Sequence, residues 1–226
     1  MRASLFLVAV LLIGFSPASA ETLVLEAIQD ATLIEDPAGA LANGSSGLLY
    51  VGRTGLSEGA LRRALVRFDV AAAVPQEAIL DAVSLSLFMW PSHPEPHEVR
   101  LHRVQSAWEE GPSSSSGGGG SPSEAGDVTW LHTSYDTLLW VEPGGDFVAR
   151  ASSALEVADT GRYDWPSTNQ LVADARLWLH APWRNFGWLL IGDELVSRSV
   201  KNFVSREHAD ITLRPTLTVT YHLPGE

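Results

Sequence analysis

The stretch from Thr129 to Trp140 carries the side chains best suited to recognising a ligand. It combines aromatic rings with hydrogen-bonding groups, the mixture that a polar ligand with an apolar face requires. The candidate ligand-binding residues are Trp130, His132, Tyr135, Trp140, Trp183 and Arg184. The alternative is that the same aromatic side chains only pin a long loop onto the rest of the fold.

The eight tryptophans of the chain divide by their sequence context. Indole faces stack on sugar rings, but they are equally good core material. Trp108, Trp178 and Trp188 lie in periodic apolar sequence, and we expect them in the core. Four others lie near turns and can be exposed or buried: Trp130, Trp140, Trp165 and Trp183. The binding hypothesis requires exposed aromatic side chains around 130–140.

Sequence motifs for catalysis are absent. The G-x-S-x-G pentapeptide does not occur, and the serines of 113–116 lie in Ser/Gly-rich sequence that cannot hold attack geometry. His97 and His102 resemble the H-E-x-x-H zinc motif, but they are five residues apart, which on a strand sends them to opposite faces. We expect two solvated histidines, no catalytic residue and no metal ligand. A surface metal site at His93 and His97 is the alternative.

Carboxylates are plentiful, and glycoside hydrolysis uses two of them. We expect Glu109-Glu110, Asp193-Glu194 and Asp127 to be solvated loop acids rather than an acid and base pair. No cofactor is expected. A structural calcium held by acidic loops is left open, although the spaced acidic loop of an EF-hand is absent.

Basic residues form a second group of candidates. They are Arg198, Lys201 and Arg206, with Arg62, Arg63 and Arg67 on a predicted strand. If these side chains converge, they can pair with an anionic sugar or a phosphate. The alternative is that they form ion pairs with the surplus of acids.

The elements that must position these residues are mostly strands. Apolar and polar residues alternate, as in half-buried strands. The clearest segments are 63–68, 83–90 and 216–221, and shorter ones are 23–27, 48–51, 99–104 and 186–191. Turn sequences such as Asn43-Gly44 separate the segments, which predicts an all-β antiparallel β-sandwich.

Two segments depart from this alternation. The apolar spacing of 168–180 predicts one short amphipathic helix, with Ser167 and Gln170 as a capping box and Pro182 ending it. Residues 111–126 are rich in Ser and Gly and predict a flexible loop. We expect this loop to lie within one domain spanning 21–226, because each flanking half has too few strands to cover its sheet faces.

The first twenty residues have the pattern of a cleavable signal peptide. Arg2 precedes an apolar run, and Ala18-Ser19-Ala20 offers small residues for cleavage after Ala20. The protein is therefore expected to be secreted or periplasmic, without membrane insertion. The sequence has no cysteine, so it must rely on its core. A formal charge of −12 argues against nucleic acid as a partner.

The order of several short motifs resembles the DNRLRE-domain family of secreted bacterial proteins. The motifs are Asp30-Ala31-Thr32-Leu33, Arg67-Phe68-Asp69, residues 78–87, Trp108-Glu109-Glu110-Gly111, residues 127–147, Asn185-Phe186-Gly187-Trp188, Gly192-Asp193-Glu194, Phe203-Val204-Ser205-Arg206-Glu207 and Arg214-Pro215-Thr216-Leu217. The resemblance covers nearly the whole of 21–226 and supports a single domain.

The resemblance implies a jelly-roll β-sandwich similar to carbohydrate-binding modules, with no catalytic residues. Arg206 and Glu207 form a buried structural pair on this reading. The leading hypothesis is a secreted, non-catalytic module that recognises an extracellular or cell-surface polysaccharide, or another cell-envelope component. The alternative is a structural or adhesive surface protein that binds other proteins.

Overall fold

The computed structural model describes residues 20–224 of the 226-residue chain. The predicted signal peptide, except for its last residue, lies outside the described residues. Within 20–224, no helix is long and apolar enough to cross a membrane.

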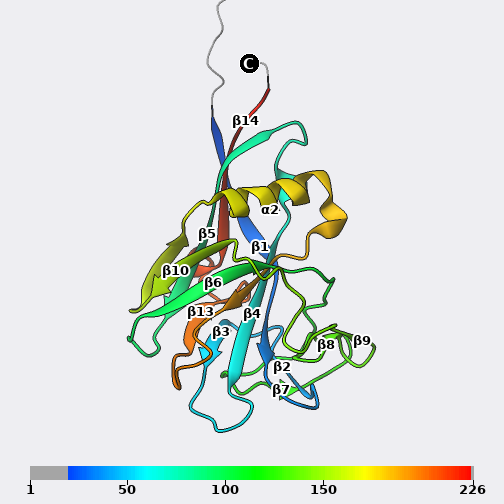
Figure 1. Cartoon of the computed structure of the whole chain (residues 1–226), viewed down its shortest axis with the longest axis vertical. Helices are drawn as coiled ribbons and strands as arrows, with labels where there is room; N and C mark the ends of the chain where they lie inside the picture. The colour runs from blue at the N-terminus through cyan, green and yellow to red at the C-terminus, as the bar shows by residue number, and fades with distance from the viewer. Residues whose placement is uncertain (1–19, 225–226) are drawn as a thin grey trace, which may run out of the picture.

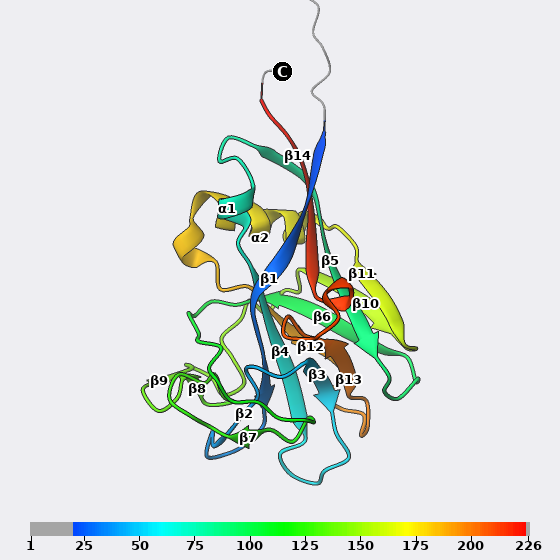
Figure 2. The same ribbon diagram turned by 180° about the vertical axis from the view of Figure 1, so that it is seen from behind.

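The described chain is built mainly from antiparallel strands (Figures 1 and 2). The strands are β1 (Glu21–Ile34), β2 (Leu41–Ala42), β3 (Leu48–Arg53), β4 (Leu61–Phe68), β5 (Ile79–Trp90), β6 (His97–Arg103), β7 (Ser121–Pro122), β8 (His132–Ser134), β9 (Leu138–Leu139), β10 (Ser153–Val157), β11 (Gly161–Trp165), β12 (Trp188–Ile191), β13 (Lys201–Val204) and β14 (Thr216–His222). The helices are α1 (Val70–Ala73) and α2 (Asn169–His180), with 3-10 turns η1 (Pro182–Arg184) and η2 (Ile211–Leu213).

Two sheets face each other and share their edge strands. The first sheet contains β14, β5, β11 and β13, and the second contains β4, β12, β6 and β10. Strand β1 pairs with β14 over Glu21–Glu26 and with β4 from Ala27 onward, and a bulge between Ala27 and Gln29 lies at the start of the second pairing. Strand β3 likewise pairs with both β13 and β4. Six strands therefore close into a barrel-like ring, which confirms the all-β antiparallel prediction.

The main core lies between the two sheets. Val83, Leu85, Leu87 and Met89 of β5 all point into it and are fully buried, as their alternation predicts. Leu217, Val219 and Tyr221 of β14 are buried in the same cluster. Burial of side chains of this size stabilises a fold by about 2 kcal/mol each.

A second core covers the outer face of the second sheet. Leu65 of β4 and Leu189 of β12 point away from the main core and pack against residues of the segment that follows β6. That segment supplies Trp108, Trp130 and Trp140 to this second core. The second sheet is thus buried on both faces where the segment covers it.

Helix α2 begins one residue later than predicted and ends as predicted. The N-cap is Thr168, whose side chain accepts a hydrogen bond from the Leu171 N–H, so the predicted capping box of Ser167 and Gln170 is wrong. Ser167 instead accepts a hydrogen bond from the Val83 N–H of β5. Trp178 of α2 packs edge-on against Trp188 with ring centroids 4.4 Å apart, and both are fully buried as expected.

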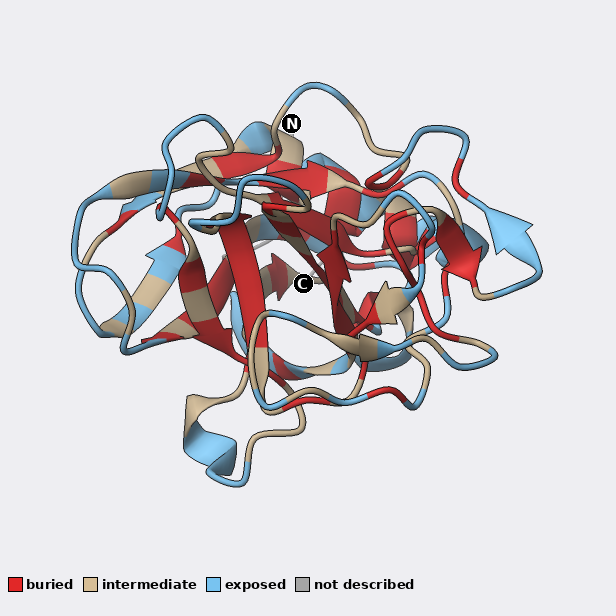
Figure 3. Cartoon of the chain, turned by 90° about the horizontal axis from the view of Figure 1, so that it is seen from below, coloured by how far each residue is buried: buried red, intermediate tan, exposed pale blue. Residues whose placement is uncertain are grey.

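The Ser/Gly-rich segment 111–126 lies on the surface, where exposed loops surround the buried strands (Figure 3). Its ends are tied by Asp127, a fully buried carboxylate that bonds the Ser113 N–H at 3.0 Å and the Glu124 N–H at 2.6 Å. Gly111 has φ of 73°, and a Cβ there would lie 2.0 Å from Asp127 Oδ1, so only glycine allows this approach. Asp127 is therefore not the solvated acid that was expected.

Candidate functional site

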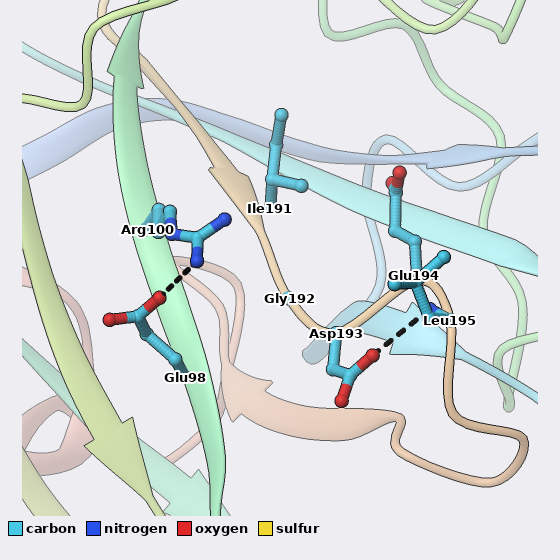
Figure 4. Close-up of a pocket in the computed structure, with 7 residues that line it drawn as sticks. All are labelled: Glu98, Arg100, Ile191, Gly192, Asp193, Glu194 and Leu195. Carbon is cyan, nitrogen blue, oxygen red and sulfur yellow. Dashed lines mark hydrogen bonds and ion pairs between the residues drawn. The ribbon is translucent and has the colours of Figure 1, made fainter.

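A pocket of about 410 Å³ opens where the covering segment leaves the second sheet bare (Figure 4). It is lined by Glu98, Arg100, Ile191, Gly192, Asp193, Glu194 and Leu195. The first two come from β6, and the rest come from β12 and the loop after it. Alternation places Glu98 and Arg100 on the outer face of β6, because Val99 and Leu101 point into the main core.

Every charged side chain of this pocket has a polar side-chain partner. Arg100 lies 2.5 Å from Glu98, and both side chains are about half exposed. Glu194 receives two hydrogen bonds from Arg63, at 2.7 and 3.1 Å, in a bidentate pair. His97 Nδ1 lies 3.0 Å from Asp193 Oδ2. Donors and acceptors alternate at the rim with little net charge.

The Asp193 carboxylate is held in place by the backbone of its own loop. Its Oδ1 accepts hydrogen bonds from the Leu195 N–H at 2.9 Å and the Val196 N–H at 3.0 Å. These hydrogen bonds lower the pKa of Asp193, and the bond from the Val196 N–H contributes most. The Leu195 N–H and His97 lower this pKa further. Asp193 is therefore ionised at neutral pH and acts as a fixed acceptor.

Arg63 connects the pocket to the second core behind it. Its guanidinium lies 4.9 Å from the centroid of the Trp130 ring and 5.6 Å from that of Phe147. It also donates a hydrogen bond to the Gly144 carbonyl at 2.8 Å. Trp130 therefore helps to hold Arg63 in place, and Arg63 in turn holds Glu194. Trp130 supports the pocket indirectly and does not line it.

The exposed aromatic surface expected around 130–140 is not found. Trp130 and Trp140 are only 8% and 5% exposed, so the exposure that the binding hypothesis requires is not observed, and the alternative of a pinned loop holds for these two. Trp140 donates its indole N–H to the Thr129 carbonyl at 3.0 Å, which secures the loop from inside. His132 is also buried; its ring is 3.0 Å from Thr129 Oγ1 and packs edge-on against Tyr135.

The other two predicted residues lie elsewhere. Trp183 and Arg184 belong to η1, directly after α2, and α2 is separated from β8 and β9 along the long axis of the fold (Figures 1 and 2). Trp183 is 73% exposed, but the structure does not bring it together with the 130–140 loop.

The remaining histidine and basic-residue predictions are also corrected. His102 is buried, its Nδ1 lies 3.0 Å from the Val148 carbonyl, and burial lowers its pKa, so it is not solvated. The basic side chains do not converge. Lys201 is fully buried and donates to the carbonyls of His93 and Glu95, whereas Arg62 donates to the Gly118 carbonyl. Arg63 forms an ion pair instead, in agreement with the alternative.

A second, larger pocket of about 550 Å³ lies beside the 130–140 loop, with Val141, Asp146 and Phe147 in its lining. The Asp146 carboxylate is already used: it accepts hydrogen bonds from Ser106 Oγ and from the backbone N–H groups of Val141 and Glu142. The lining of this pocket contains the acids Glu142 and Asp146 and no basic residue, so it lacks the paired acids and bases of the β6–β12 pocket.

A cluster of three carboxylates is the only metal-compatible group within residues 20–224. Asp30, Glu110 and Glu207 each bring a carboxylate oxygen to within 4.8 Å of the others. Asp30 follows the bulge in β1, Glu110 lies in the segment after β6, and Glu207 follows β13. Arg206 is the cation bonded to this cluster, to Glu110 at 2.8 Å and also to Glu207. The expected Arg206–Glu207 pair is therefore present, but its side chains are 35% and 21% exposed, so it is not buried as expected.

The cluster carries an electrostatic cost. Burial, followed by the nearby charge of Glu207, raises the pKa of Asp30 well above its usual value. Burial also raises the pKa of Glu110. Among the described residues, these are the only two carboxyl groups with a raised pKa. Glu110 was expected to be solvated, and it is instead part of this partly buried network.

Sequence reasoning missed the pocket and found only fragments of the cluster. One sequence signal could have indicated Glu98 and Arg100: they are opposite charges two residues apart on a predicted strand, with an apolar residue between them.

A scan of protein-family models finds no match to the chain, and a search of curated proteins finds no similar sequence. The resemblance to the DNRLRE-domain family stays a prediction.

Proposed function

We propose that this protein is an exported, non-catalytic module that binds a polysaccharide at the β6–β12 pocket. The observation that carries the proposal is the charge-paired rim of that pocket beside exposed aliphatic side chains. The proposal keeps the function expected from the sequence and moves its site from the 130–140 loop to the open face of the second sheet.

The chemistry of the rim suits sugar hydroxyl groups. Each hydroxyl donates one hydrogen bond and accepts others, so adjacent donors and acceptors such as Arg100 and Glu98 match neighbouring hydroxyls. Leu195, which is 93% exposed, and Ile191 offer apolar surface to the face of a sugar ring. Because the charges at the rim are paired, a neutral polysaccharide fits better than a highly charged one.

The same pairing argues against hydrolysis at this pocket. A glycosidase needs a carboxylic acid that keeps its proton to protonate the leaving oxygen. The lowered pKa of Asp193 makes it a poor acid, and Glu194 is committed to its bidentate pair with Arg63. The module is therefore assigned a binding role.

The finer fold assignment and the cellular location belong to this proposal as well. A jelly-roll sandwich, membership of the DNRLRE-domain family, a bacterial source and export through residues 1–20 form one consistent account. It is supported by the two-sheet antiparallel fold and by the order of the sequence motifs.

The proposal is tested by affinity electrophoresis of residues 21–226 through gels containing a panel of neutral and anionic polysaccharides, with pull-down on insoluble ones. Arg100→Ala and Leu195→Ala should each weaken binding to a retained glycan at least ten-fold. Trp183→Ala is the matched control, because its side chain is exposed but lies far from the pocket, and it should bind as the wild type does.

The outcomes separate the function from its site. Failure of every glycan to retard the protein would refute polysaccharide binding. Retardation that survives both pocket variants would refute the site, and loss of binding in Trp183→Ala would place the site at η1.

A second candidate function is adhesion to other proteins, and a specific surface favours it. Leu138 and Leu139 of β9 and the following Val141 are 62%, 66% and 85% exposed. Neighbouring exposed aliphatic side chains are typical of association surfaces. Concentration-dependent self-association that Leu139→Gln abolishes, measured by light scattering, would support this function.

A further inference from the structure

We propose that Asp30, Glu110 and Glu207 bind a calcium ion that joins three distant segments of the chain. This inference goes beyond the proposed polysaccharide binding, and it concerns a different part of the molecule. It is carried by the geometry of the three carboxylates and by two buried oxygens that have no partner.

The spacing of the carboxylates suits a cation with an ordinary calcium coordination distance. Calcium binds oxygens at about 2.3–2.6 Å, so two oxygens on opposite sides of the ion are separated by about 4.8 Å. The ligand oxygens of Asp30, Glu110 and Glu207 all lie within 4.8 Å of one another. This spacing is compatible with one ion that contacts all three carboxylates.

Two oxygens in this cluster lack a partner. Asp30 is fully buried; its Oδ2 accepts a hydrogen bond from the Arg206 N–H at 2.7 Å, but its Oδ1 has no donor. Oε2 of Glu207 is also buried and without a donor. A buried polar atom without a partner is unfavourable, so both oxygens are available for a ligand.

The other oxygens of the cluster orient the site. Oε1 of Glu110 accepts a hydrogen bond from the Asp30 N–H at 2.7 Å, and its Oε2 accepts one from Arg206 at 2.8 Å. Arg206 also bonds Oε1 of Glu207. These bonds fix the three carboxylates before any ion arrives, and carboxylate oxygens have further lone pairs with which to bind it.

The charge of the cluster calls for a cation. The Arg206 guanidinium bonds Glu110 and Glu207, and Asp30 accepts a hydrogen bond only from the Arg206 backbone N–H. Arg67 is a second cation that acts on Glu110, so two positive charges face three carboxylates, and negative charge remains in excess when all three are ionised. The donors are all oxygens, which suit calcium, whereas zinc favours His and Cys. Magnesium prefers to keep several of its own waters, so a cluster with a fully buried Asp30 suits it less.

The ion would add to the hydrogen bonds and the ion pair that already link the three segments. Asp30 lies where β1 has joined the second sheet, Glu110 begins the Ser/Gly-rich segment, and Glu207 lies in the turn after β13. A ligand that binds only the folded state stabilises it in proportion to the logarithm of its concentration. Calcium, abundant outside cells, would thus act as a cross-link in a chain without cysteine.

The test is calorimetric titration of calcium chloride into residues 21–226 after removal of metals with EDTA, together with thermal melts in EDTA, magnesium and calcium. We expect one calcium per chain and a midpoint at least 5 °C higher in calcium than in EDTA. Asp30→Asn and Glu207→Gln preserve side-chain shape and should weaken calcium binding at least ten-fold. Glu77→Gln, at an exposed carboxylate in the turn before β5, is the control and should bind as the wild type does.

Each result decides the proposal. Absence of calcium binding by the wild type, with equal melting in EDTA and calcium, overturns it. Undiminished binding in both folded cluster variants also overturns it. If Asp30→Asn does not fold, Glu207→Gln and the wild-type melts give the same decision.

Discussion

The β6–β12 pocket and the carboxylate cluster are both built from acids and arginines, but their charge balance differs. In the pocket, Arg63, Arg100 and His97 face Glu194, Glu98 and Asp193 one to one. In the cluster, three carboxylates face two cations, Arg206 and Arg67. The pocket opens to solvent, whereas Asp30 at the centre of the cluster is fully buried.

This difference indicates what each site can accept. A charge-paired, open rim can exchange water for the hydroxyl groups of a neutral ligand without leaving a buried charge unpaired. A buried site with surplus negative charge must take up a proton or a cation. Substitutions of the matching arginines separate the two sites experimentally.

Loss of the arginine in the cluster should have the largest effect. Arg206→Met leaves Glu110 and Glu207 without their bonded cation. Two charge-assisted hydrogen bonds are lost, and we expect a loss of about 3 kcal/mol in the free energy of unfolding. Urea denaturation in EDTA measures it, and calcium should restore part of the loss. A loss below about 0.5 kcal/mol, the scale of an exposed pair, would contradict a buried charge deficit.

The equivalent substitution in the pocket should cost less. Arg63→Met removes the hydrogen bonds to Glu194 and Gly144 and the contact with Trp130, with an expected loss of about 1–2 kcal/mol. Only one carboxylate, Glu194, loses its cation here, whereas two lose theirs in Arg206→Met, so the loss stays smaller. The same denaturation series should show no rescue by calcium; rescue equal to that of Arg206→Met would make the two sites indistinguishable.

The cluster should also give the protein a pH dependence that calcium removes. Burial and then Glu207 raise the folded-state pKa of Asp30, with Glu110 adding to the effect and the Arg206 N–H opposing it. This proton-linked stability is fully present below the unfolded pKa of aspartate and is lost as the pH rises through the folded pKa. Denaturation in EDTA should show this decline, and Asp30→Asn should flatten it. A decline unchanged in that variant would assign the effect to another group.

The smallest effect on stability is expected at the exposed pair of the pocket. Glu98 and Arg100 are 49% and 57% exposed, so Glu98→Gln should change the free energy of unfolding by less than about 0.5 kcal/mol. Polysaccharide binding should nevertheless weaken, because an acceptor of the rim is lost. An unchanged affinity would remove Glu98 from the site.

The sheets and the main core could be predicted from the sequence because they follow from local alternation. In Val83 to Met89 and in Leu217 to Tyr221, every second residue is apolar and buried. This alternation can be read from the sequence without knowing which strands pack against it. The positions of Trp130 and Trp140 could not be predicted in this way. Their burial depends on the segment after β6 folding back over the outer face of β4 and β12, and turn residues beside them do not reveal it.

The two sites depend on contacts between residues far apart in the chain. Asp30 and Glu110 are separated by 80 residues, and Arg63 and Glu194 by 131. A local sequence pattern cannot predict which of the many acidic residues pairs with a given arginine. The Ser/Gly-rich composition of 111–126 likewise predicts a loop. It does not reveal that the Asp127 carboxylate accepts hydrogen bonds from backbone N–H groups near both ends of that loop.

Anomalous scattering from crystals of residues 21–226 soaked with terbium, a calcium substitute, tests the central claim most directly. The account predicts one strong peak among the carboxylates of Asp30, Glu110 and Glu207, at about 2.3–2.6 Å from Asp30 Oδ1, and none at the charge-paired pocket. An empty cluster, or a peak at Asp193 and Glu194 instead, would contradict it.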